Sequence, residues 1–313
     1  MSAPKILVIR FSAIGDCVIT AWPVSALRKA LPEAQIVWAV QERCSDVILS
    51  PGLVDEKVLA DRDRWKAMRW SPLTWNQQLR AFIGLRRYQF DVGFDFQGHG
   101  KTAACLKISG AKLRLTNRGT DPMAKKMNTL VECGVGKVHE VEAGFRLVSS
   151  WHKCELPERP MMPCPGTGQP SDTILIQTGS GHPTKTVRIE TWQELARQLL
   201  AKGHKVVSIG GPRDPKICVD GIEENVGKLS LVQTLALIRS AKLHVSADTG
   251  TAHISAAYGI PTVTVFGPMD PVRFRPYSDA GEVLRNSNNP NDVTCDEILS
   301  ACEKSLGGRL SAS

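Results

Sequence analysis

The feature that most constrains the fold is an alternation, in both halves of the chain, of short β-branched apolar runs with amphipathic segments of helical period. In the first half it predicts strands at 5–11, 34–40 and 90–96 and helices at 18–30 and 101–108. In the second half it predicts strands at 173–179, 205–211, 243–248 and 262–267 and helices at 190–202, 231–240 and 251–258. This alternation is typical of parallel sheets covered by helices. We therefore expect an α/β protein with two doubly wound, Rossmann-like domains.

A proline-rich stretch separates the two halves. Between residues 155 and 172 the chain reads ELPERPMMPCPGTGQPSD, and its five prolines exclude a helix or a central strand. We predict an N-terminal acceptor-binding domain at 1–156, a linker at 157–172 and a C-terminal nucleotide-sugar domain at 173–313, whose last helix could also pack back on the first domain. Such sheets bind ligands beyond the carboxyl ends of their strands, so we expect the domains to face a central cleft.

Composition excludes several classes of protein. The nine cysteines contain no C-x-x-C pair, and no apolar run approaches the roughly 20 residues that span a bilayer. With no leader evident at its start, the chain is expected to be soluble and cytoplasmic. The net charge of +8 indicates an anionic partner, which could be a nucleic acid, a membrane surface or a phosphorylated substrate. Because no nucleic-acid-binding motif is present, we do not expect a nucleic acid.

The stretch SADTGTAHISAAYGIPTVTVFG (residues 246–267) predicts a phosphate site in the second half. Asp248, Thr249 and Gly250 should form a strand-to-helix turn, where free amides and the helix dipole favour an anion. His253 falls in the first helical turn, near the same mouth. In the alternative interpretation, Asp248 or Thr249 only caps the helix and His253 is a hydrogen-bonded spectator.

A second turn, TGSGHPTKT (residues 178–186), follows another predicted strand. Thr178, Gly179 and Ser180 could present groups to a diphosphate, and Lys185 could supply a mobile positive charge. Neither a P-loop nor a G-x-G-x-x-G after the first strand is present, which disfavours a dinucleotide oxidoreductase. We therefore expect the second half to hold a nucleotide diphosphate.

The turn after the first strand, SAIGD, is the candidate chemical site. Asp16 lies where a carboxylate could act as general base, with Ser12 and Gly15 beside it; alternatively, Asp16 caps the following helix. In FDFQGHGKTA, Asp95 and Gln97 with Gly98 stand in the equivalent place after another strand, and Lys101 begins the next helix. These residues could orient a sugar or bind an anionic group.

The segment 62–88 concentrates basic residues and tryptophans. From residue 76 onward we expect Leu79, Phe82 and Ile83 to pack inward, so that part of the charge is a solvated helix face. The preceding Arg62, Arg64 and Lys66 could instead grip a multiply anionic acceptor or an interfacial lipid headgroup.

Four motifs together resemble the ADP-heptose:lipopolysaccharide heptosyltransferases, glycosyltransferase family 9, most closely the type that adds the first heptose. These motifs are KILVIRFSAIGD, DVGFDFQGHGKTA, TGSGHPTKTVRIETW and SADTGTAHISAAYGIPTVTVFGPMDPVRFRPY. The resemblance implies the two-domain GT-B fold and an inverting, metal-independent transfer, with no cofactor, from ADP-heptose to Kdo or heptose of the lipopolysaccharide inner core. It also implies peripheral contact with the inner face of the cytoplasmic membrane, where the lipid-linked acceptor lies.

Individual roles follow from the same resemblance. Asp16 matches the catalytic aspartate and Lys185 the diphosphate-binding lysine, while Asp248, Thr249, Gly250 and His253 match the nucleotide-sugar turn. The loop GGPRDPK (residues 210–216) offers no evident acidic partner for a ribose. Two alternatives remain: an ADP-sugar transferase that acts on a protein or another glycan, and a nucleotide-binding protein without catalysis.

Overall fold

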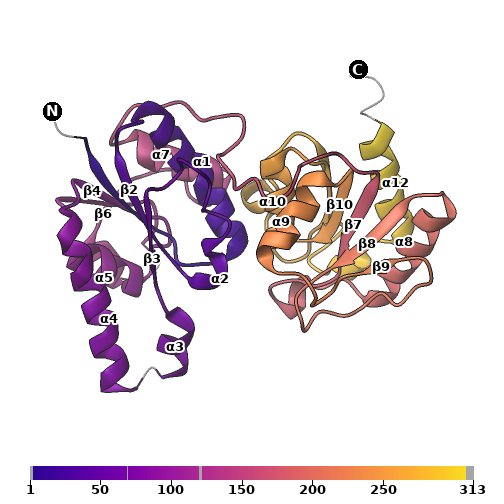
Figure 1. The fold of residues 1–313 in the computed structure, drawn as a ribbon, viewed down its shortest axis with the longest axis horizontal. Coiled ribbons are helices and arrows are strands. Elements are labelled where there is room, and N and C mark those ends of the chain that lie inside the picture. The colour runs from indigo at the N-terminus through magenta and orange to yellow at the C-terminus, as the bar shows by residue number, and fades with distance from the viewer. Residues whose placement is uncertain (1–2, 69, 120–121, 308–313) are drawn as a thin grey trace. The chain divides into compact units, whose positions relative to one another are not determined.

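The computed structural model describes residues 3–68, 70–119 and 122–307, apart from the side chains of residues 62, 63 and 66. Its contacts divide the chain into two compact units, Met1–Pro163 and Cys164–Ser313. The boundary falls inside the stretch for which we predicted a linker. Within the described residues, each unit contains a six-stranded parallel sheet with helices packed against it (Figure 1).

The first sheet has the strand order β3-β2-β1-β4-β5-β6, and all neighbouring pairs are parallel. Its strands are β1 (Lys5–Ile9), β2 (Gln35–Val40), β3 (Glu56–Leu59), β4 (Val92–Asp95), β5 (Leu113–Thr116) and β6 (Thr129–Leu130). The chain leaves β1 toward β2 on one side and later returns to β4 on the other. This reversal makes the carboxyl ends of β1 and β4 the switch point where doubly wound sheets bind ligands.

Helices cover both faces of this sheet. They are α1 (Ile14–Ala30), α2 (Glu42–Ser45), α3 (Arg62–Ala67), α4 (Pro72–Gly84), the 3₁₀ turn η1 (Leu85–Tyr88), α5 (Gly100–Ile108), α6 (Pro122–Met127) and α7 (Glu140–Ser149). α1 packs against α7, and on the opposite face Leu7 and Ile9 of β1 share a core with Phe82 and Leu106 of α4 and α5. Burial of each such side chain stabilises the fold by about 1.5–3 kcal/mol.

The prediction that Leu79, Phe82 and Ile83 all pack inward is wrong for two of the three. Phe82 is 6% exposed, whereas Leu79 is 48% and Ile83 45% exposed. The ring of Phe82 meets that of Trp65 edge-on at 5.6 Å, and this contact sets the rotation of α4 about its axis. Because apolar residues lie on more than one face of α4, periodicity alone did not identify the buried face.

The second sheet has the order β12-β11-β10-β7-β8-β9, again with parallel neighbours. Its strands are β7 (Thr173–Gln177), β8 (Lys205–Ile209), β9 (Glu223–Glu224), β10 (Leu243–Ala247), β11 (Thr262–Val265) and β12 (Gly281–Leu284). Here the switch point lies between β7 and β10, which are the strands that precede the two predicted phosphate turns.

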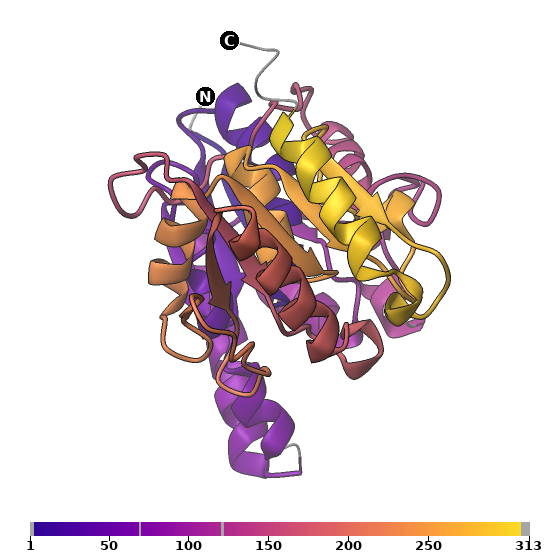
Figure 2. The same cartoon turned by 90° about the vertical axis from the view of Figure 1, so that its right-hand side faces the viewer.

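The helices of the second unit again pack on its sheet. They are the 3₁₀ turn η2 (Pro183–Lys185), α8 (Ile189–Ala201), α9 (Leu231–Ser240), α10 (Gly250–Tyr258), α11 (Pro271–Phe274), the 3₁₀ turn η3 (Pro290–Asp292) and α12 (Cys295–Gly307). α8 and α12 lie side by side over one face (Figure 2), and α9 packs against α10. The last helix therefore contributes to the core of its own unit, through Ile298 and Cys302.

Candidate functional site

Asp16 lies in the first turn of α1, directly after β1. Its Oδ2 atom accepts a hydrogen bond from the backbone N–H of Ala13 at 3.0 Å and lies 2.6 Å from a guanidinium nitrogen of Arg10. Asp16, the third residue of α1, thus helps to cap the helix by accepting from the N–H of the N-cap residue Ala13, as the alternative interpretation expected. Its side chain is nevertheless 32% exposed, whereas that of Arg10 is 8% exposed. The carboxylate is therefore held in place by Arg10 and Ala13 and is still partly accessible to solvent.

The charges around Asp16 keep it ionised. Burial tends to raise the pKa of this carboxyl, but the charge of Arg10, the N–H of Ala13 and the charge of Arg118 outweigh it and hold the pKa below its usual range. Arg10 is itself anchored, since its Nη1 donates a hydrogen bond to the carbonyl of Phe96 at 2.6 Å. Arg118 forms a second ion pair with the buried Glu140.

The loop after β4 is organised by a buried carboxylate. Asp95 accepts hydrogen bonds from the backbone N–H groups of Gln97 at 3.0 Å and Gly98 at 2.9 Å and from the hydroxyl of Thr102 at 3.0 Å. Burial raises the pKa of Asp95 to about 6, although these hydrogen bonds oppose the shift. The amide oxygen of Gln97 accepts from the backbone N–H of Phe11 at 3.1 Å. This hydrogen bond joins the loops after β1 and β4. The candidates Ser12, Asp16 and Gln97 therefore lie together at the carboxyl ends of these strands.

The other acceptor candidates of the first unit are more dispersed. Gly15 is buried in the first turn of α1, and Lys101 is exposed in the first turn of α5. Arg64 is exposed on α3, where its backbone N–H donates to the capping carboxylate of Asp61 at 3.3 Å. The next residue, Trp65, is buried and contacts Phe11, which ties α3 to the β1 loop. The side chains of Arg62 and Lys66 lie outside the described part of the structure.

In the second unit, an ion pair joins the two predicted phosphate turns. Lys185 Nζ, from η2, lies 2.6 Å from Oδ2 of Asp248, which follows β10. Asp248 is buried and Lys185 partly exposed. The residue that caps α10 is Thr249, whose hydroxyl accepts from the backbone N–H of Thr251 at 3.3 Å. His253 is buried one turn further into α10.

The loop after β7 lies against a carboxylate that sequence reasoning overlooked. The hydroxyl of Thr178 is buried without a hydrogen-bond partner among the described residues, and that of Ser180 donates to the carbonyl of His182 at 2.7 Å. A Cβ added to Gly179 would lie 1.9 Å from the carboxyl carbon of Asp214. Only glycine leaves room for this carboxylate at that point.

The loop at residues 210–216, in which no evident acidic partner for a ribose was expected, carries Asp214. Its Oδ2 accepts from the backbone N–H of Gly211 at 2.6 Å and from the side-chain amide of Gln177 at 3.3 Å. The loop thus places an acidic group at the carboxyl ends of β7 and β8. Asp214 is part of the motif GGPRDPK, but the sequence does not show where its side chain points. That direction depends on how the loop passes Gly179.

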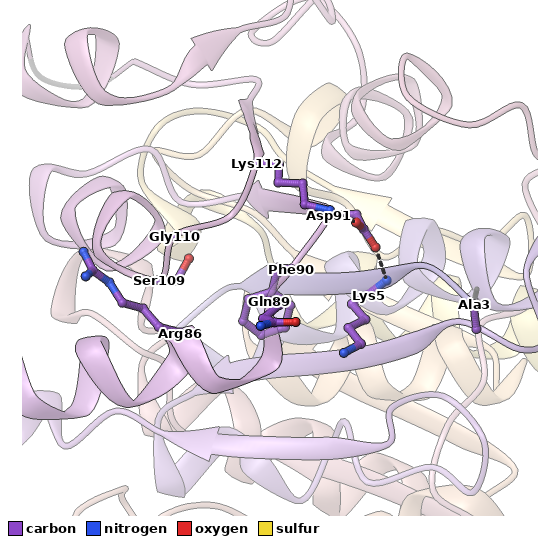
Figure 3. A pocket seen from close by; sticks show the side chains of 9 residues that line it. All are labelled: Ala3, Lys5, Arg86, Gln89, Phe90, Asp91, Ser109, Gly110 and Lys112. Atoms are coloured by element: carbon purple, nitrogen blue, oxygen red, sulfur yellow. Dashed lines mark hydrogen bonds and ion pairs between the residues drawn. The ribbon is translucent and has the colours of Figure 1, made fainter. Parts of the chain in front are cut away.

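A cavity of about 590 Å³ lies at the amino ends of β1, β4 and β5, at the opposite end of these strands from Asp16 (Figure 3). It is lined by Ala3, Lys5, Arg86, Gln89, Phe90, Asp91, Ser109, Gly110 and Lys112. Asp91 accepts the backbone N–H of Lys5 at 3.0 Å and pairs with Lys112 at 2.8 Å. None of the predicted site residues lines this cavity.

The described residues offer neither a metal cluster nor a membrane-spanning helix. No group of three or more His, Cys, Asp or Glu side chains is arranged to hold a metal ion. Among the described helices, none combines the length and the apolar character needed to cross a membrane.

Comparison with known proteins places the chain in a family. The model of glycosyltransferase family 9 (heptosyltransferase) matches residues 79–300. The sequence is 24% identical over 286 residues to lipopolysaccharide heptosyltransferase 1 of Pseudomonas aeruginosa, covering 85% of this chain and 79% of that protein. It is also 24% identical over 289 residues to lipopolysaccharide heptosyltransferase 1 of Escherichia coli K12, covering 85% and 89%.

The fold is similar to that of the E. coli heptosyltransferase WaaC solved with ADP. The TM-score is 0.82 at 20% sequence identity, over 96% of this chain and 99% of that one. E. coli ADP-heptose lps heptosyltransferase II gives a TM-score of 0.78 at 21% identity, over 97% and 99%. Because the family model spans well over half of the sequence and the fold agrees, the chain belongs to glycosyltransferase family 9, the heptosyltransferases, and has their GT-B fold.

Proposed function

We propose that this protein is an inverting, metal-independent glycosyltransferase that moves heptose from ADP-heptose to a hydroxyl of Kdo or heptose in the lipopolysaccharide inner core, with Asp16 as general base. The observation that supports this role most directly is the Arg10–Asp16 ion pair. It presents an ionised, partly exposed carboxylate at the switch point of the first sheet.

The reaction follows from that carboxylate. Asp16 accepts the proton of the acceptor hydroxyl while the oxygen attacks the anomeric carbon of the heptose from the side opposite the diphosphate. The bond from the anomeric carbon to the diphosphate oxygen breaks, ADP departs and the configuration inverts. A carboxylate with a lowered pKa is a weak base, so proton transfer suits a late stage, when the new C–O bond has made the hydroxyl acidic.

The second unit supplies the donor site in this proposal. Lys185 and the amide groups at the N-terminus of α10 stabilise the negative charge that develops on the departing ADP. Further donor contacts are assigned to Thr178, Gly179, Ser180, Asp248, Thr249, Gly250 and His253, and Asp214 is placed to accept from the ribose. These cationic and dipolar groups take the part that a metal ion plays in other transferases, and no cofactor is needed.

The acceptor side is anionic in the same proposal. Its phosphates and carboxylates are bound by basic and polar groups of the first unit, namely Ser12, Gly15, Arg62, Arg64, Lys66, Gln97 and Lys101. Because that acceptor is attached to lipid, the enzyme works in the cytoplasm as a peripheral protein on the inner face of the cytoplasmic membrane.

The direct test replaces Asp16 by Asn and measures turnover and ADP binding separately. Loss of a general base lowers kcat by about 10²–10⁴-fold, and ADP affinity should be unchanged by calorimetry. The matched control is Asp91→Asn, which removes a carboxylate from the other edge of the same sheet. If Asp16→Asn changes only stability, Asp16 is a helix cap and the assignment fails.

An acceptor panel tests the substrate. Lipopolysaccharides truncated at Kdo or at the first heptose, an unrelated glycan and a protein are each incubated with ADP-heptose, with and without a chelator, and products are identified by mass. Chelator-resistant transfer to a truncated lipopolysaccharide supports the proposal. Transfer only to the protein or the unrelated glycan, or no transfer with intact ADP binding, supports one of the two alternatives instead.

A further inference from the structure

An apolar stripe on α4 is exposed to solvent. Trp75, Leu79 and Ile83 are spaced four residues apart, so they lie on one face of the helix, and they are 57%, 48% and 45% exposed. We call these three residues the α4 stripe. Trp70, which precedes the helix, is 79% exposed. The buried side of α4 packs through Phe82, whose ring contacts that of Trp65. About half of the surface of each stripe side chain therefore remains open to solvent.

The stretch of chain that carries the stripe has charged residues of one sign. Residues 64–90 contain six Lys or Arg and no Asp or Glu. Arg80, Arg86 and Arg87 are all exposed. Arg87 forms an ion pair with Glu56 of β3 at 3.1 Å, and both side chains of this pair are exposed. Exposed aromatic and aliphatic residues flanked by arginines are the composition of helices that lie in a membrane interface.

The position of the stripe allows contact with a planar surface. In both views the α3–α4 hairpin extends beyond the edge of its sheet, to the lower left in Figure 1 and at the bottom in Figure 2. A projecting helix can reach a bilayer without a rearrangement of the sheet that carries Asp16.

We propose that the α4 stripe docks this protein on an anionic lipid bilayer, with its apolar side chains among the headgroups and acyl ends and Arg80, Arg86 and Arg87 facing lipid phosphates. A second copy of the chain fits less well, because a symmetric contact through this face would set arginines against arginines. The inference rests on the proposed function in one respect: it locates the surface that the membrane contact requires.

The test measures binding of the full chain to vesicles that contain neither donor nor acceptor. Vesicles of phosphatidylglycerol and phosphatidylethanolamine are compared with phosphatidylcholine vesicles by co-sedimentation. The stripe variant is Trp75→Ser/Leu79→Ser/Ile83→Ser, and the matched control is Val232→Ser/Val272→Ser, two exposed valines of the second unit. We expect the stripe variant to bind anionic vesicles at least tenfold more weakly than the wild type and the control.

A second variant measures the electrostatic contribution to vesicle binding. Arg80→Gln should weaken binding by about fivefold, and the difference should shrink as salt is raised. Unchanged circular dichroism and melting temperature show that both variants are folded. The inference is overturned if the wild type binds neutral and anionic vesicles equally or not at all, or if the stripe variant binds as the wild type does. It is also overturned if the wild type is a dimer in lipid-free solution that the stripe variant dissociates.

Activity assays keep this failure distinct from failure of the proposed function. The stripe variant should transfer heptose to a deacylated, water-soluble core acceptor at the wild-type rate and lose transfer to the same acceptor embedded in vesicles. If the wild type binds anionic vesicles through the stripe but transfers no heptose to either acceptor, the proposed function fails and the docking surface stands. If soluble and embedded acceptors are used equally by both proteins, the docking surface fails and the proposed function stands.

Discussion

Lys185 Nζ lies 2.6 Å from Oδ2 of Asp248, although 63 residues separate them in the chain. The ion pair brings the loop after β7 and the loop after β10 to one point at the switch of the second sheet. A diphosphate bound there would share the lysine with Asp248, and this arrangement leads to the first prediction.

Lys185→Ala should weaken ADP binding by about 10- to 100-fold, the worth of a hydrogen bond to a charged group. It should also lower the melting temperature, because the buried Asp248 loses its cation. Calorimetric titration with ADP measures the first effect. Lys202→Ala is the control, since that lysine forms an exposed pair with Glu303. Unchanged ADP affinity with reduced stability would show that the ion pair is only structural.

Arg10→Gln should move the acidic limb of the kcat–pH profile to higher pH. In the wild type, Arg10 holds the pKa of Asp16 below its usual range, so the base stays ionised at a lower pH than an ordinary aspartate does. Without that charge, burial raises the pKa and Asp16 becomes protonated at a higher pH.

Arg28→Gln is the matched control for this change, because Arg28 is equally buried and pairs with Asp55 at 2.6 Å. Both variants should lose about 2 kcal/mol of stability, but only Arg10→Gln should shift the profile. A profile that stays in place with Arg10→Gln contradicts the role of Asp16 as base.

Gly179→Ala should destabilise the second unit by about 1–3 kcal/mol, because its Cβ would overlap the carboxylate of Asp214. Gly181→Ala, two residues further on, should change stability by less than about 0.5 kcal/mol, since a Cβ there meets nothing within 4 Å. Urea unfolding of both variants measures the difference. In the double variant Gly179→Ala/Asp214→Ala the loss should be partly recovered; equal effects at both glycines would rule out the close approach.

His244 should make the second unit sensitive to acid. It is fully buried in β10, both ring nitrogens lack a hydrogen-bond partner among the described residues, and burial lowers the pKa to about 3. The unfolded chain binds a proton near pH 6.5 and the folded chain does not. Stability is therefore complete above pH 6.5 and falls by about 1.4 kcal/mol per pH unit as pH drops toward 3.

His244→Leu removes this titration, so the melting temperature measured by calorimetry should depend less steeply on pH between 6.5 and 4. His204→Gln, at a partly exposed histidine, is the control. The same slope in His244→Leu and the wild type would mean that other groups carry the acid sensitivity.

Local sequence determined most of the framework. The central strands β1, β2, β4, β7, β8, β10 and β11 lie within the predicted ranges. They are recognisable because β-branched runs between helical periods suit a parallel strand buried on both faces. Gly259 ends α10 with a φ of 73°, directly after the predicted helix 251–258, in the left-handed conformation that glycine favours at such a position. Two of the edge strands, β6 and β9, are only two residues long. Strands this short carry no periodic signal, so their pairing came only from the structure.

The candidate site divides in the same way. Asp16, Lys185 and Asp248 could be identified in the sequence because each follows a recognisable strand at a turn rich in small residues. Their partners could not. Arg10 lies in the same turn as Asp16, and only the folded path of that turn shows that they pair. Asp214 meets Gly179, and Lys185 meets Asp248, because the second sheet brings separate loops to the carboxyl ends of its strands. The exposed side of α4 was likewise set by what packs against Phe82. A strand or helix is favoured by its own residues, whereas the direction and burial of a side chain depend on distant segments that only the folded chain brings together.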